Sequence, residues 1–84
     1  PTGDAPRARA EVSGADAGTH FDLGTAYHGM GLADDALREF ASAAQDPAWK
    51  ARSLVMTAQI RVGLGQIDQA VADLREAVQS AQTK

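Results

Sequence analysis

The sequence GMGLADDA, residues 29–36, returns in related form as GLGQIDQA, residues 63–70, so the same pattern recurs 34 residues later. Closely spaced glycines can cradle a phosphate, and the dinucleotide-binding form adds a third glycine and a preceding strand. Asp34 stands where that third glycine would fall. The recurrence instead indicates a turn within an internal repeat, and a repeat of this length predicts the architecture of the whole chain.

Length and composition limit the chain to one small helical domain. A length of 84 residues excludes a second domain. Folding of a chain of this size buries only roughly 60% of the unfolded surface, so its stability margin should be thin. Hydrophobic residues make up 44% of the 84 residues, but only one Trp, one Tyr and two Phe are present. Much of the remainder is alanine, which favours closely packed helices. The predicted fold class is therefore all-α.

Charge and missing residue types argue against several functions. Eight basic and eleven acidic residues give a net charge of -3 without a basic patch, which disfavours nucleic acid as a partner. No cysteine is present, so neither a disulfide nor a thiolate zinc site can form. No apolar run approaches a membrane span, so we expect a soluble chain without membrane insertion. The compartment stays open, with the cytoplasm favoured.

A first helical hairpin is predicted after residue 16. Residues 1–16 contain two prolines and two glycines without apolar periodicity, which is typical of a flexible segment. The first helix then ends at Gly31, which suits a left-handed cap, and Asp34 offers an N-cap to the second helix. Apolar residues follow helical spacing at Phe21, Leu23, Ala26, Tyr27 and Met30, and again at Leu37, Phe40, Ala41 and Ala44.

A second hairpin begins at Asp46-Pro47, where aspartate is the predicted cap and proline takes the first helical position. Its helices are expected over residues 47–64 and 68–81, separated by Gly65. An offset of 34 residues pairs Gly24 with Ala58, Gly31 with Gly65, Ala36 with Ala70, Phe40 with Leu74 and Ala43 with Ala77. Small residues are thus expected where the helices of a hairpin cross, with Phe40 and Leu74 filling the space beside them.

This pattern resembles the tetratricopeptide repeat, whose signature is W-x2-L-G-x2-Y, then A-x3-F, then P. The first copy has Leu23-Gly24, Tyr27, Ala36, Phe40 and, one residue early, Pro47. The second copy keeps Ala58, Ala70, Leu74 and Ala77 but has Thr57 for leucine and Arg61 for tyrosine. The resemblance implies a domain over residues 17–84, with repeats at 17–50 and 51–84, that forms a short right-handed α-solenoid.

No catalytic or metal-binding pattern emerges. His20 and His28 are eight residues apart and lack the i+4 partner of a helical zinc site. No serine stands in a nucleophile turn, and the acidic residues are interpreted as helix caps and solvated faces. We therefore expect a protein that is not an enzyme and that uses no cofactor or metal.

The resemblance implies instead a protein-binding groove on the first helices of the hairpins. Phe21, Val55 and Val62 are not needed inside either hairpin, so they are expected to be exposed apolar anchors for a protein or peptide. The predicted groove consists of Phe21, Thr25, His28, Arg52, Val55, Met56, Gln59 and Val62. Alternatively, these apolar residues are scattered on the surface or are covered by residues 1–16. Trp49 is interpreted mainly as a packing residue.

Gly29 and Gly63 are expected to contribute to the groove, whereas an acidic chain terminus is disfavoured as its ligand. Gly29 and Gly63 would let the backbone of a partner come close. Members of the family that bind an acidic chain terminus use a clamp of lysine and asparagine. The matching positions here are Phe21, Thr25 and Met56, so the clamp is absent.

The last predicted helix presents a second apolar face, at Val71, Leu74, Val78 and Ala81. We expect Val71 and Val78 to stay partly uncovered. Repeat proteins usually bury such a face on a further repeat, so we predict that the chain is either cut from a larger array or pairs with itself through helix four. The competing interpretation of the chain is structural: a segment of a longer solenoid, or a self-associating unit, with no peptide ligand of its own.

Overall fold

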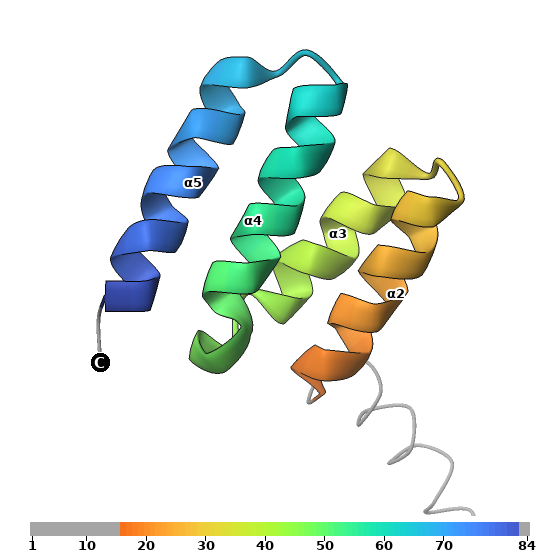
Figure 1. Ribbon diagram of the computed structural model, residues 1–84. Coiled ribbons are helices and arrows are strands. Elements are labelled where there is room, and N and C mark those ends of the chain that lie inside the picture. Colours follow the sequence, from red (N-terminus) through yellow and green to blue (C-terminus); the bar gives the residue numbers. More distant parts are fainter. Residues whose placement is uncertain (1–15, 83–84) are drawn as a thin grey trace, which may run out of the picture.

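The computed structural model describes residues 16–82, in which every regular element is an α-helix. The all-α prediction is therefore confirmed. The helices are α2 (Ala17–Gly29), α3 (Ala33–Ala43), α4 (Pro47–Gly63) and α5 (Ile67–Gln82). They follow one another across the molecule, from α2 at one end to α5 at the other (Figure 1). The flexible segment predicted at the N-terminus falls, up to residue 15, outside the described residues.

Each helix packs on the next one in the chain. The pairs α2 with α3 and α4 with α5 are the two predicted hairpins, and α4 joins them by packing on α3 and, to a smaller extent, on α2. Within the described part of the chain, α3 and α5 flank α4 without touching each other. The right-handed solenoid stays a prediction.

Glycine turns close both hairpins. Gly31 and Gly65 have φ angles of 79° and 81°, in the left-handed region that glycine adopts without strain. At the first turn, the Leu32 N–H donates to the Tyr27 carbonyl at 2.9 Å, and the equivalent bond of the second turn is 2.8 Å. These bonds satisfy carbonyls that the helix end would leave free. The two predicted glycine caps are confirmed.

Aspartates begin α2 and α4. Asp46 accepts the Ala48 N–H at 2.9 Å, and Pro47 is the first residue of α4, as predicted. At the start of α2, Asp16 accepts hydrogen bonds from the hydroxyl and the backbone N–H of Thr19, at 2.7 and 3.2 Å. These two donors, the hydroxyl above all, hold the pKa of Asp16 below its usual value.

The prediction that Asp34 caps α3 is wrong. The cap residue is Leu32, whose carbonyl already accepts the Ala36 N–H at 2.9 Å. The helix therefore begins at Ala33, as soon as the chain leaves the glycine turn. Asp34 and Asp35 lie in the first helical turn, where their negative charge interacts favourably with the helix dipole.

Phe40 lies at the centre of the core. Its side chain is fully buried, and its ring lies so close to α2 that a Cβ atom at Gly24 would come within 2.8 Å of it. The core around it combines buried Ala36 and Ile60 with the partly buried side chains of Phe21, Tyr27, Ala33, Leu37 and Met56. Because α4 supplies Ile60 and Met56, both hairpins share this core.

Leu74 does not repeat the role of Phe40, although it occupies the equivalent position. Its side chain is 43% exposed, whereas Phe40 is inaccessible. Phe40 is covered because α4 packs on α3, but no described helix packs on the outer side of α5. The expectation that Leu74 fills an enclosed space is therefore wrong.

The contact between Gly24 and Phe40 can be tested with a matched pair of alanine substitutions. We expect Gly24→Ala to lower the free energy of unfolding by about 1–3 kcal/mol, because the new methyl group overlaps a ring that cannot move away. Gly29→Ala is the control, since a Cβ atom there meets nothing within 4 Å. It should be neutral or stabilising by up to about 1 kcal/mol in urea titration. Equal effects of the two substitutions would contradict the assigned contact.

Ser53 of α4 offers a second stability test. It is completely buried, and its Oγ atom has no hydrogen-bond partner among the described residues. An unpaired buried hydroxyl is destabilising, so we expect Ser53→Ala to raise the free energy of unfolding by about 1 kcal/mol. Thermal or urea unfolding measures the change, and a loss of stability would show that the hydroxyl is satisfied.

Candidate functional site

Phe21, the predicted anchor of the groove, belongs to the core. Its ring centroid lies 5.2 Å from that of Phe40, edge to face, and 5.3 Å from that of Trp49 on α4. The expectation that Phe21 is exposed and independent of folding is wrong, because α4 places Trp49 on its ring and leaves it half-buried. These contacts confirm the interpretation of Trp49 as a packing residue.

Three other predicted groove residues have local contacts. The Thr25 hydroxyl donates to the Phe21 carbonyl one turn earlier, at 3.1 Å. The Arg52 guanidinium lies 4.7 Å from the centre of the Trp49 ring, a cation–π contact. Met56 packs against the core cluster. Thr25 and Arg52 remain exposed, whereas the Met56 side chain is half-buried and packs into the core beneath the predicted groove.

His28 and Gln59 are brought together from different hairpins. Both are exposed, and both line a hollow of about 190 Å³ where the ends of α2 and α4 lie near the first turn. The rest of its wall is small or apolar: Gly31, Ala33, Ile60, Gly63 and Leu64. Val62, beside Gly63 in the chain, is 53% exposed. Of the predicted groove residues, His28 and Gln59 line this hollow.

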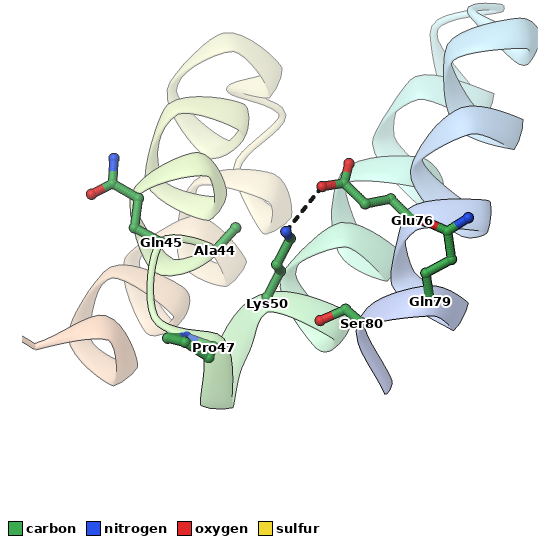
Figure 2. A pocket seen from close by; sticks show the side chains of 7 residues that line it. All are labelled: Ala44, Gln45, Pro47, Lys50, Glu76, Gln79 and Ser80. Carbon is green, nitrogen blue, oxygen red and sulfur yellow. Dashed lines mark ion pairs between the residues drawn. The ribbon is translucent and has the colours of Figure 1, made fainter. Parts of the chain in front are cut away.

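A larger hollow, of about 660 Å³, lies between the end of α3, the start of α4 and the second half of α5 (Figure 2). It is lined by Ala44, Gln45, Pro47, Lys50, Glu76, Gln79 and Ser80, none of which was predicted as a site residue. Lys50 Nζ lies 3.1 Å from Glu76 Oε2, so these two charges cancel. The hollow exists because α3 and α5 do not contact each other across α4. No sequence motif indicates its presence.

An acidic residue at the same position of both hairpins contacts a basic side chain of the preceding helix. His20 Nδ1 lies 2.7 Å from Glu39 Oε1, between α2 and α3. Arg61 Nη1 donates to both carboxylate oxygens of Asp73, at 3.0 and 2.9 Å, between α4 and α5. Asp73 is buried, which corrects the interpretation of all acidic residues as caps or solvated groups. The signal in the sequence is the 34-residue spacing of Glu39 and Asp73.

An exposed apolar stripe runs along α5. Its members, spaced by four and three residues, are Ile67, Val71, Leu74 and Val78. Each of them is between 42 and 55% exposed. The expectation that Val71 and Val78 stay partly uncovered is confirmed. Self-association through this face stays a prediction.

Residues 16–82 contain no group of three or more His, Cys, Asp or Glu side chains that could hold a metal ion. None of the described helices has the length and apolar character that crossing a membrane requires. Neither a family model, nor a curated protein, nor a solved structure matches the chain. The function must therefore be argued from the surfaces described above.

The corrected position of Phe21 gives a direct test. We expect Phe21→Ala to lower the free energy of unfolding by about 2 kcal/mol, less than a fully buried phenylalanine, because ring contacts with Phe40 and Trp49 are lost. Val62→Ala should change it by no more than about 0.5 kcal/mol, since the side chain is exposed. Denaturant titration of both variants measures the difference. If Phe21→Ala left the free energy of unfolding unchanged, the Phe21 ring would not be part of the core.

Proposed function

We propose that the chain is a non-enzymatic protein-binding module, similar to a pair of tetratricopeptide repeats, that holds an extended or helical segment of another protein. Its role would be that of a scaffold or adaptor. The observation that carries the proposal is the hollow shared by His28 and Gln59. It lies where the first helices of both hairpins meet and combines apolar walls with two polar side chains. Small pockets of this kind suit an apolar anchor residue of a partner.

The chemistry of the hollow suggests how a peptide would be held. Ile60 belongs to the core cluster and gives the hollow a fixed floor, whereas Leu64 is exposed at its wall. The Gln59 amide both donates and accepts hydrogen bonds, and the His28 ring can do the same, so together they suit the backbone of a partner. Gly63 adds close access, because a Cβ atom there would meet nothing within 4 Å.

The burial of Phe21 and Met56 changes the proposed contact surface. Both side chains belong to the core, so the predicted groove residues that remain exposed and can touch a partner are Thr25, His28, Arg52, Val55, Gln59 and Val62. A surface this small should bury an area at the low end of specific interfaces, so we expect modest affinity. The anchor residue of the partner would contact the apolar wall of the hollow, so affinity should depend little on salt.

Gly63 and Gly29 provide a matched test, because they are equivalent in the repeat but only Gly63 lines the hollow. We expect Gly63→Leu to fill the hollow, whereas Gly29→Leu should leave it open. A Cβ atom at either position meets nothing within 4 Å, so both variants should fold. Peptides selected from a displayed random library on the wild-type protein would be titrated against both variants by fluorescence anisotropy.

The expected result has two parts. The selected peptides should share one large apolar residue, and their affinity should fall at least about tenfold in Gly63→Leu but stay unchanged in Gly29→Leu. Equal binding to both variants would show that the hollow is not the binding site.

A further inference from the structure

In the first hairpin, α2 and α3 form an apolar socket that α4 fills. The socket residues, all buried or half-buried, are Phe21, Ala33, Leu37 and Phe40. One face of α4 carries four buried or half-buried side chains, at i, i+4, i+7 and i+11: Trp49, Ser53, Met56 and Ile60. Trp49 lies on the Phe21 ring, and Met56 and Ile60 belong to the cluster around Phe40. This interface joins the two hairpins.

The second hairpin repeats the socket but leaves it open. The equivalent residues, 34 positions later, are Val55, Ile67, Val71 and Leu74. All four are apolar, and their exposed fractions lie between 38 and 52%. In the described part of the chain α5 packs on α4 alone, and it lies at the end of the row of helices in Figure 1. The second hairpin therefore has the residues of a socket, but residues 16–82 contain no helix that packs on them.

Stacking of a second copy of this chain, end to end, would not fill the open socket well. Such stacking would place α2 of the second copy where α4 lies in the first hairpin. The residues of α2 that correspond to Ser53, Met56 and Ile60 are Thr19, Asp22 and Ala26. The exposed Asp22 would then be buried against apolar side chains, which is unfavourable for a carboxylate without a partner.

We infer that the open socket of the second hairpin docks an amphipathic helix of a partner protein, with large apolar side chains at i, i+7 and i+11 and a small one at i+4. The occupied socket of the first hairpin supplies this pattern. Val55 and Leu74 replace Phe21 and Phe40 and are smaller, so the open socket has more room beside position i. A large aromatic residue is therefore preferred there.

The open socket is independent of the hollow proposed as the peptide site. The hollow is lined by residues such as His28, Gln59 and Gly63, and none of its lining residues belongs to the open socket of the second hairpin. The two surfaces can therefore be disabled separately. Failure of one proposal leaves the other unaffected.

A synthetic peptide covering residues 46–63 is the probe, because its stripe fills the equivalent socket in this fold. Labelled peptide would be titrated with the whole protein and followed by fluorescence anisotropy. The matched control peptide carries Trp49→Ala, Met56→Asp and Ile60→Ala, which are the residues that stand 34 positions earlier in the sequence. We expect saturable binding of the first peptide and at least tenfold weaker binding of the control.

Protein variants place the binding on the socket. Val71→Asp should weaken peptide binding at least tenfold, and Gly63→Leu, which blocks only the hollow, should leave it unchanged. Val71 is 42% exposed, so Val71→Asp should keep its melting temperature. If it unfolds, Ile67→Asp, at a position 52% exposed, replaces it with the same expected loss.

Two results without peptide binding would overturn the inference. One is the absence of peptide binding by a protein that sediments as a monomer at all concentrations. The other is a dimer that dissociates in Val71→Asp while the peptide does not bind, because the face would then serve pairing between two copies of this chain. Peptide binding that survives Val71→Asp would also exclude the socket.

Discussion

The contact between Gly24 and the ring of Phe40 is the constraint on which the rest of the fold depends. Because position 24 has no side chain, α2 and α3 approach closely enough for the ring to lie on the backbone of α2. Phe40 is then held where Phe21 meets it edge to face and where α4 can cover both. The packing of α4 on the first hairpin therefore depends on the lack of a side chain at Gly24. A methyl group there would move α2 and α3 apart and change the surface that α4 contacts.

The two hairpins share the same turns and helix crossings but differ in which side chains they bury. Glycine turns, small residues at the crossings and an acidic residue on the second helix recur in both. The first hairpin contains an aromatic core, whereas in the second Leu74 stays exposed and a partly buried ion pair of Arg61 and Asp73 links the helices. Elements with few buried apolar contacts open at lower free energy, so α5 is expected to be less firmly held than α3.

Two surfaces follow from this asymmetry, and they suit different ligands. The hollow at His28 and Gln59 is small, apolar at its floor and polar at its rim, which favours a single anchor residue in a peptide. The face of α5 is long and apolar, which favours the side of a helix. Under the two proposals made above, the chain would hold two segments at once, one near the turns and one along α5.

The sequence by itself determined the helices, the hairpins and their turns, because these depend on local chemistry: glycine at Gly31 and Gly65, Asp46 before Pro47, and a 34-residue spacing. One local feature was predicted wrongly from the sequence, namely the start of α3. Asp34 has the chemistry of a cap, but the helix begins at Ala33, directly after the glycine turn. The tertiary structure alone decided which apolar residues are covered. Phe21 and Val55 occupy equivalent positions, yet Trp49 covers only Phe21. A helix periodicity identifies a face, whereas burial depends on which neighbour packs against that face.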